Sequence, residues 1–428
     1  MGVNASASDD ELKNSKLLPG SDQSEAGHSD VVQTGYCLND VKYPASLDTE
    51  HACAERAGSS HKCHSEHIKK DFEFLIGSLE KVPATAQKLY NLSKLYLTTG
   101  SSKSSDHEGF NSLFEPLAPN QPGLAEDSSD QELTSDTRST AIPSDCSLFT
   151  PMRKSSPLYR GQTYIQWRAA QDLNNFYFLC LPKRRTIYLQ PIDHFPEFVT
   201  SFRLATPHLS LDLFETLLGF AQIYFLGLEV MVRPPISIGT SGWNLSSRIN
   251  PTTGQMQFCV NDFFPLLQAS LPPDGLCVAG LIWTDLYPQG FNFVLGEASF
   301  QHKSAVVSFG RFENDDSCAD ITKVDDQVLW KLFKSLSHEV CHLLGLQHCQ
   351  FFLCAMNESS SVTQALSQPL FLCPVCLRKV QRACGFDVLE RYQRLQQFLT
   401  TISKQFGGSG RFQESLLWLE RCISYLNT

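Results

Sequence analysis

The segment Ser337–Cys349, S-H-E-V-C-H-L-L-G-L-Q-H-C, holds the residues best suited to chemistry. His338 and His342 are four positions apart, so on an α-helix their imidazoles project from one face and can share a zinc ion. Gly345 can adopt a left-handed backbone that ends the helix and turns the chain, after which His348 supplies a third nitrogen. Three neutral ligands leave the fourth tetrahedral position open, as a catalytic zinc requires.

Glu339 follows the first histidine and lies about 100 degrees around the helix from it. We therefore expect its carboxylate beside the metal, where it can take a proton from the attacking water and later pass it to the leaving amine. In the competing interpretation the two helical histidines only form hydrogen bonds. Gly345 and His348, at suitable offsets, favour the zinc site.

A second constellation begins at the next residue. Cys349, Cys354, Cys373 and Cys376 follow the pattern C-x4-C, 18 intervening residues, and C-x2-C. Two such pairs are typical of a closed structural zinc site with four thiolates, the alternative being four unrelated buried thiols. Because His348 and Cys349 are consecutive, an extended backbone would aim them in opposite directions. We therefore expect two zinc ions per chain, bound on either side of one short segment.

The cysteine count also bears on the compartment. The chain holds 15 cysteines, an odd number, and residues 1–30 show no basic stretch followed by an apolar run. We therefore expect a reducing, intracellular location, cytoplasmic or nuclear, in which clustered cysteines bind metal. The longest apolar stretch, Thr216–Leu228, is shorter than the roughly 20 residues of a spanning helix, so no transmembrane segment is expected.

The net charge of −10 lies entirely in residues 1–144, which hold 22 Asp and Glu against 12 Lys and Arg. This segment is rich in Ser, Asp, Gly and Asn and is predicted to be a mostly disordered acidic arm, with two short helices near residues 68–97. The remaining residues are neutral overall, and a neutral body does not favour nucleic acid as a partner.

From residue 145 onward the pattern is that of a folded domain. Apolar residues at helical spacing predict helices over residues 210–225, 261–269 and from about 325 through the histidines. Alternating or continuous β-branched runs predict strands over residues 184–192, 228–238, 275–284, 292–300 and 305–312, the second of them interrupted by Pro234 and Pro235. This order favours an α+β fold in which a twisted mixed sheet packs against helices. The division we expect is an arm over 1–144, a catalytic domain over 145–405 and a C-terminal helix or tail over 406–428.

The motif H-E-x-x-H-x-x-G-x-x-H followed by Met356 resembles the metzincin signature, and the four interleaved cysteines resemble the archaemetzincin family in particular. Leu370–Leu377 (LFLCPVCL) and the segment around Asp285–Pro288 add to this likeness, which covers roughly residues 184–405. The resemblance implies a twisted sheet above an active-site helix, a zinc-bearing C-terminal subdomain after Gly345, and zinc-dependent hydrolysis of peptide bonds. It also implies the roles that follow: His338, His342 and His348 as catalytic zinc ligands, Glu339 as general base, Met356 as the Met-turn residue, and Cys349, Cys354, Cys373 and Cys376 as ligands of the structural zinc.

The same resemblance suggests how substrate is held. In metzincins a rim strand beside the zinc pairs with an extended peptide, and Asn292–Phe300 is the candidate here. Proline at Glu297 or Ala298 is then expected to raise KM. The partner is a peptide or protein substrate, and we expect the chain to act as a monomer. The alternative function is a catalytically silent zinc-binding module that binds a protein partner on the same fold.

Two further patterns are weak. Met1–Ser6 fits N-myristoylation, but the acidic residues after it provide no basic second signal for stable membrane attachment. Arg378, Lys379 and Arg382 follow the last cysteines at helical spacing, and we interpret them as a solvated helix face rather than a nucleic-acid site.

Overall fold

The computed structural model describes residues 60–98, 148–152, 158–177, 184–206, 209–310, 322–359, 361–408 and 410–428. Most of the acidic arm, with the Met1–Ser6 pattern, lies outside the described residues, so the prediction of disorder there stays a prediction. No helix among the described ranges is long and apolar enough to cross a membrane.

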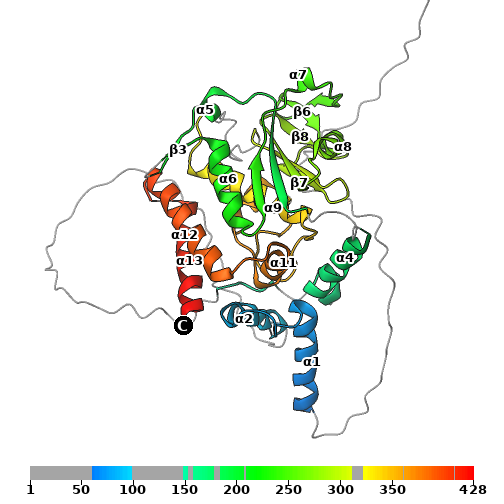
Figure 1. Ribbon diagram of the computed structural model, residues 1–428, viewed down its shortest axis with the longest axis vertical. Coiled ribbons are helices and arrows are strands. Elements are labelled where there is room, and N and C mark those ends of the chain that lie inside the picture. Colours follow the sequence, from blue (N-terminus) through cyan, green and yellow to red (C-terminus); the bar gives the residue numbers. More distant parts are fainter. Residues whose placement is uncertain are drawn as a thin grey trace, which may run out of the picture. The chain divides into compact units, whose positions relative to one another are not determined.

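The central element is a mixed five-stranded sheet in the order β4-β1-β7-β10-β9 (Figure 1). β1 runs parallel to β4 and β7, β7 is parallel to β10, and β9 is antiparallel to β10. The expected mixed sheet is therefore confirmed, with β9 at one edge. The strands are β1 (Thr186–Ile192), β4 (Glu229–Val232), β7 (Gly275–Ile282), β9 (Gly296–Ser299) and β10 (Ser304–Ser308).

Alternating side chains divide between the two faces of this sheet. Ala279, Leu281 and Val307 face the larger core, in which α6 (Leu213–Tyr224) and α9 (Asp326–Leu343) pack. Val278 and Val306 face a smaller core formed with α8 (Val260–Ser270). Figure 1 shows α6 and α8 on opposite sides of the strands. A strand buried on both faces needs apolar residues throughout, which explains the near-continuous apolar run of β7.

Helix α9 carries the predicted catalytic motif and begins where the sequence indicates. The Asp325 side chain accepts the Val328 N–H at 2.9 Å and so caps the first turn. Leu329, Phe333 and Leu336 recur at helical spacing and are buried, and Phe333 stacks on Phe220 of α6 with 4.1 Å between ring centroids. This packing against α6, β9 and β10 fixes the helix beside the edge strand.

Two predicted strands differ clearly in length from those observed. The predicted strand over 228–238 ends at Val232, because Pro234 and Pro235 lack the N–H that a ladder needs. The predicted strand over 292–300 reduces to β9, preceded by a single bridge between Val294 and Leu286. Smaller elements complete this region: β2 (Leu204–Ala205), β3 (Ser210–Leu211), β5 (Ser247–Ile249), β6 (Met256–Cys259), β8 (Asp285–Tyr287), α5 (Glu197–Thr200) and α7 (Ile238–Ser241).

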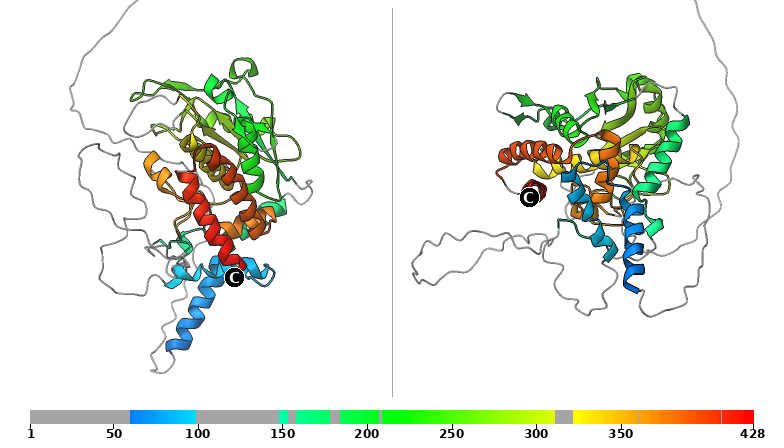
Figure 2. Two further views of the ribbon diagram at one scale, coloured as in Figure 1. Left: turned by 90° about the vertical axis from the view of Figure 1, so that its left-hand side faces the viewer. Right: turned by 60° about the horizontal axis from the view of Figure 1, so that its bottom comes forward.

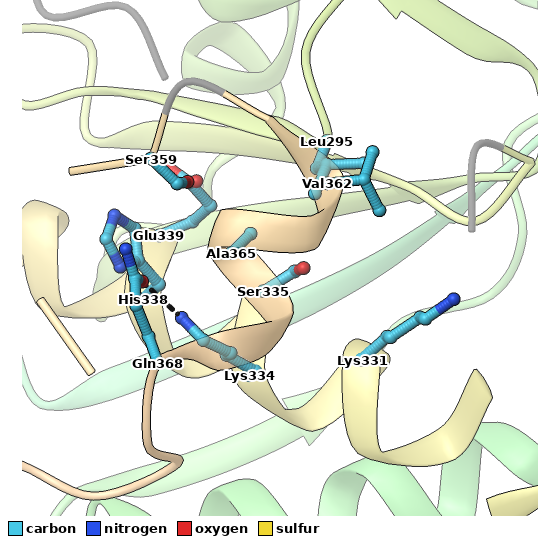
Figure 3. A pocket seen from close by; sticks show the side chains of 10 residues that line it. All are labelled: Leu295, Lys331, Lys334, Ser335, His338, Glu339, Ser359, Val362, Ala365 and Gln368. Carbon is cyan, nitrogen blue, oxygen red and sulfur yellow. Dashed lines mark hydrogen bonds between the residues drawn. The ribbon is translucent and has the colours of Figure 1, made fainter. Parts of the chain in front are cut away.

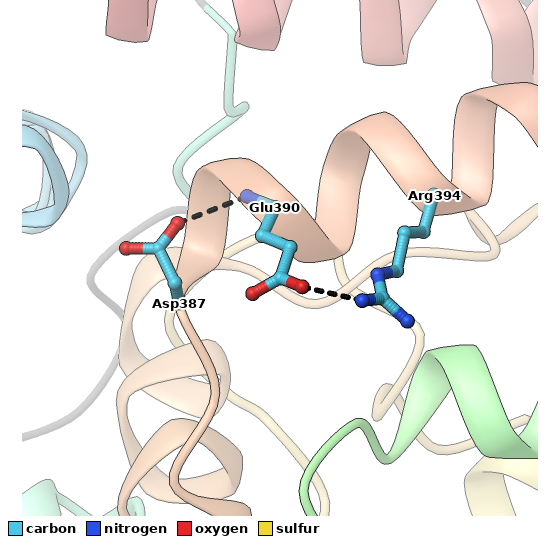
Figure 4. A network of polar contacts seen from close by, with 3 residues as sticks. All are labelled: Asp387, Glu390 and Arg394. Atoms are coloured by element: carbon cyan, nitrogen blue, oxygen red, sulfur yellow. Dashed lines mark hydrogen bonds and ion pairs between the residues drawn. The ribbon is translucent and has the colours of Figure 1, made fainter.

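Helices α10 (Val362–Ser367), α11 (Pro374–Cys384), α12 (Val388–Gln405) and α13 (Arg411–Asn427) follow the catalytic motif. Asp387 caps α12 by accepting the Glu390 N–H at 2.9 Å, and Glu390 pairs with Arg394 at 2.6 Å (Figure 4). Both side chains of that ion pair are about half exposed, so the cap contributes more to helix stability than the pair does. α12 and α13 pack against each other (Figure 2).

The segment 60–98 forms three helices where the sequence indicates two: α1 (Ser60–Ile76), α2 (Ala84–Asn91) and α3 (Lys94–Thr98). They contact α11, α13 and α4 (Tyr164–Tyr177), which follows the short helix η1 (Leu158–Arg160). Tyr90 is fully buried, and its hydroxyl donates to Gln381 of α11 at 2.9 Å. Residues 60–98 therefore pack as part of the folded body.

Candidate metal centres and active site

The two histidines of α9 face each other with their ring orientations fixed. Nδ1 of His338 lies 2.7 Å from the Ala355 carbonyl oxygen, and Nδ1 of His342 lies 2.7 Å from that of Leu346. A carbonyl only accepts, so each Nδ1 must carry the proton and each Nε2 is left with a lone pair. The two Nε2 atoms are 2.9 Å apart. Two facing lone pairs repel, so this geometry suits a shared cation.

His348 completes the cluster from the far side of a turn. Gly345 has a φ of +82°, a left-handed backbone conformation that favours glycine over other residues. The chain then returns to place the His348 ring 5.5 Å from His338 and 5.0 Å from His342, measured between ring centroids. One nitrogen from each of the three rings lies within 4.8 Å of the others.

The surroundings keep the three imidazoles neutral, which is the form that binds metal. Burial holds the pKa of His338 and of His342 well below the usual range, and burial lowers that of His348 to about 4. A set of three neutral nitrogens with one open position fits zinc.

Backbone groups at the end of α9 are held by side chains from the segment before the sheet. Trp167 of α4 donates its indole N–H to the Leu344 carbonyl at 3.0 Å. Gln162 donates to the Gly345 carbonyl at 3.0 Å and accepts the Gln347 N–H at 3.1 Å. These bonds fix the turn that returns His348 to the cluster.

Lys379 in turn holds Gln162. Its ammonium group donates to the side-chain and backbone oxygens of Gln162, and Lys379 is only 1% exposed. The interpretation of Arg378, Lys379 and Arg382 as a solvated face is therefore wrong for Lys379. The two acceptors explain how a charged side chain can be buried there.

Glu339 is buried beside the cluster and against the edge strand. A Cβ on Gly296 of β9 would lie 2.9 Å from Cγ of Glu339, so glycine leaves the room that the carboxylate needs. Burial and the nearby Glu297 carboxylate raise the pKa of Glu339, and Lys334 opposes them. The higher pKa makes the carboxylate a stronger base.

Glu297 is a second buried carboxyl, and it gives a stability prediction. Its Oε2 has no hydrogen-bond partner among the described residues, and burial raises its pKa from 4.5 to about 7. Because the fold favours the protonated form, its contribution to stability is complete below pH 4.5 and is lost as the pH rises through about 7.

Glu297→Gln is therefore expected to unfold at a temperature a few degrees above wild type at pH 8, with the two curves meeting near pH 4.5. Thermal unfolding across pH measures this. The exposed Glu197→Gln should not change the curve. A constant offset between wild type and Glu297→Gln over the whole pH range would contradict the assignment.

The four predicted cysteine ligands form a second cluster. Their sulfur atoms all lie within 4.8 Å of one another, and all four residues are buried. Hydrogen bonds from the neighbouring thiols hold the pKa of Cys349 well below its usual range, whereas burial raises that of Cys373. Cys373 and Cys376 stand at the N-terminus of α11. A set of four sulfurs this close together fits zinc, which would bind them as thiolates.

The loop that links the two clusters is held by Asn357, which sequence reasoning missed. Its amide donates to the Cys349 and Phe352 carbonyls at 2.8 and 3.0 Å and accepts the Cys354 N–H at 2.7 Å. Met356 is fully buried in this loop, and its carbonyl accepts the Cys349 N–H at 2.7 Å. No spacing rule marks Asn357 in advance, because its partners lie on both sides of it within an irregular loop.

The comparisons agree with this geometry. The model of Peptidase family M54 matches residues 274–382. Archaemetzincin-2 of Rattus norvegicus is 30% identical over 286 residues, which are 57% of this chain and 76% of the relative. The chain belongs to the archaemetzincin family. It is therefore a zinc metallopeptidase.

Two other archaemetzincins are also similar to this chain. Archaemetzincin-1 of Homo sapiens is 34% identical over 245 residues, 51% of this chain and 47% of that relative. The crystal structure of archaemetzincin from Archaeoglobus fulgidus, complexed with malonate, is 26% identical and covers 45% of this chain and 99% of its own, with a TM-score of 0.31.

Proposed function

We propose that the three histidines, His338, His342 and His348, hold a catalytic zinc and that Glu339 is the general base. The observation that carries this proposal is the geometry of His338 and His342. Their Nε2 atoms lie 2.9 Å apart, and the Nδ1 atom of each ring is bonded to a backbone carbonyl oxygen. We also propose that the cysteine cluster holds a second, structural zinc, which gives two zinc ions per chain. Met356 is assigned to the Met-turn by its place in the family motif.

The chemistry divides between the metal and the chain. A zinc ion held by these residues would polarise the scissile carbonyl, lower the pKa of bound water and stabilise the oxyanion. Glu339 takes a proton from the attacking water and returns it to the leaving amine. Ala355 and Leu346 hold the imidazoles of His338 and His342 in the ligating tautomer, and the bonds from Gln162 to Gly345 and Gln347 keep His348 in place.

Among the described residues β9 pairs with another strand only on its β10 side, and we propose that its other edge pairs with the substrate backbone. The Ser308 N–H donates to the Leu295 carbonyl at 2.9 Å. In an antiparallel pair the bonded positions alternate, so the backbone polar groups of Gly296 and Ala298 point away from β10. An extended peptide can use these groups next to Glu339.

Ala298→Pro removes an outward N–H without removing one from the β9–β10 ladder. We expect it to raise KM several-fold with kcat little changed. Ala298→Gly, which keeps the N–H, is the matched control. Steady-state kinetics on one peptide would count against this role if KM were the same in both variants and wild type. Proline at Glu297 is a poorer test, because that N–H belongs to the ladder.

The function itself is tested with a fluorogenic peptide library. The zinc-loaded protein is expected to hydrolyse peptides, and a chelated sample is not. Activity should return when zinc is added back to the chelated sample. If the loaded and chelated samples give the same background, the chain is a silent zinc-binding module and the peptidase mechanism fails. The intact Glu339 and the third histidine favour the enzyme, since partner binding alone needs neither.

A further inference from the structure

A small pocket opens beside Glu339 and His338, between α9, α10 and the start of β9 (Figure 3). Its volume is about 30 Å³. One water needs roughly 10–15 Å³ in this measure, so the pocket accepts a group of two or three heavy atoms, such as a carboxylate. Leu295, Val362 and Ala365 line it and offer apolar contact to methylene groups.

Two lysines of α9 supply the charge of this pocket. Lys331 and Lys334 line it together with Ser335 and His338, at positions that share one helix face. They are only 3% and 6% exposed. Both lysines are therefore shielded from bulk water. Glu339 is the one carboxylate among the lining residues.

Lys334 is the lysine nearer to the chemistry. Its ammonium donates to the Gln368 side-chain oxygen at 2.8 Å, and Figure 3 shows it pointing toward Glu339 while Lys331 extends toward the other end. Gln368 is neutral and is itself held by the Glu358 carbonyl at 2.8 Å. Burial lowers the pKa of Lys334 to about 8, so the side chain is still mostly charged at pH 7. Gln368 leaves the ammonium charge uncompensated, and Glu339 is a carboxylate that acts on it. A substrate carboxylate would add a charge-assisted hydrogen bond to this ammonium.

The pocket also lies where a substrate side chain would reach it. A peptide paired with the edge of β9 away from β10 runs past Gly296 and Glu339, and Leu295 lies immediately before that strand. A side chain next to the scissile bond can then pass the apolar wall and bring its end to Lys334.

We propose that this pocket selects a substrate carboxylate next to the scissile bond, with Lys334 as the main determinant and Lys331 in support. The inference rests on the proposed peptidase function. The carboxylate can come from a glutamate or aspartate side chain or from the C-terminus of a short peptide.

The first test separates these sources with matched peptides. Internal peptides with amidated ends carry Glu, Gln or Lys on either side of the cleaved bond, and a second set compares free with amidated C-termini near that bond. Wild type is expected to cleave the favoured carboxylate peptide with a kcat/KM about tenfold to a hundredfold above its neutral counterpart, as for a charge-assisted hydrogen bond. Preference within the first set identifies a side chain, and within the second a C-terminus.

Variants assign the preference to Lys334. Lys334→Met should abolish it, Lys334→Arg should retain most of it, and Lys334→Glu should turn the preference toward Lys. Lys404→Met removes an exposed charge on α12 and should leave the wild-type preference intact. Equal kcat/KM for charged and neutral peptides in wild type would overturn the inference without requiring any variant to fold.

Binding measured without turnover separates this inference from the function it rests on. Reduced-amide peptides with Glu or Gln at the cleavage position are titrated calorimetrically into zinc-loaded and metal-free protein. If the Glu peptide binds more tightly than the Gln peptide, and Lys334→Met loses this difference, the pocket is supported. Absence of cleavage in the same protein would then remove only the peptidase mechanism. Cleavage with no preference for a Glu side chain or for a free C-terminus removes the pocket and keeps the mechanism.

Discussion

Glu339→Gln is expected to lower kcat/KM for peptide hydrolysis on the order of a thousandfold, within the range that a general base contributes. The glutamine keeps the shape of the side chain beside Gly296 but cannot accept the proton of the attacking water. The imidazoles of His338 and His342 do not depend on this carboxylate for their orientation, because their Nδ1 partners are backbone carbonyls. Zinc content and unfolding temperature should therefore not fall.

The control is Glu420→Gln, which neutralises an exposed carboxylate on α13. It should match wild type in kinetics and metal content. If Glu339→Gln hydrolyses peptides at the wild-type rate, another group activates the water. If it loses zinc as well as activity, its effect is structural and the role of general base is wrong.

The second large effect concerns the cysteine cluster. Cys376→Ala should reduce the bound zinc from two ions per chain to one and greatly lower the unfolding temperature, because a structural zinc contributes on the order of 10 kcal/mol of folding free energy. Activity should fall as well, since Cys349 follows His348 and its N–H bonds to the Met356 carbonyl at 2.7 Å. Metal analysis and thermal unfolding measure the first two effects.

Cys384→Ala is the matched control, because Cys384 is also a buried thiol on α11 but lies outside the cluster. Its loss should cost about 1 kcal/mol and no zinc. Equal unfolding temperatures and equal zinc contents in the two variants would show that the four sulfurs are packed thiols rather than ligands.

Local rules in the sequence predicted the elements that carry the chemistry. The spacing of His338 and His342 depends only on helix geometry, and Asp325 marks the start of α9 because a cap acts within one turn. Gly345 takes the positive φ that the turn requires. The alternation of strands and helices in the sequence predicts a mixed sheet. This pattern determines the order of the strands better than the residues at which each strand begins and ends. The strand that contains β4 was predicted to end too late, and the strand that contains β9 was predicted to begin too early.

Contacts between distant segments were beyond the reach of those rules. The basic residues around Lys379 predicted an exposed helix face. Lys379 is buried instead, because Gln162, 217 positions earlier in the chain, supplies two hydrogen-bond acceptors. The sequence around Lys334 is that of an ordinary helix and does not indicate that its ammonium bonds to Gln368 in the pocket. Such pairings depend on tertiary packing, which no period or spacing in the chain encodes.

Zinc-edge anomalous diffraction from crystals of the zinc-loaded protein tests the central claim most directly. We expect one peak at about 2.0–2.1 Å from a nitrogen of each of His338, His342 and His348, with solvent in the fourth position beside Glu339. A second peak should lie about 2.3 Å from the four cysteine sulfurs. Imidazoles that point apart with no metal between them, or a fourth position filled by a protein side chain, would contradict the account.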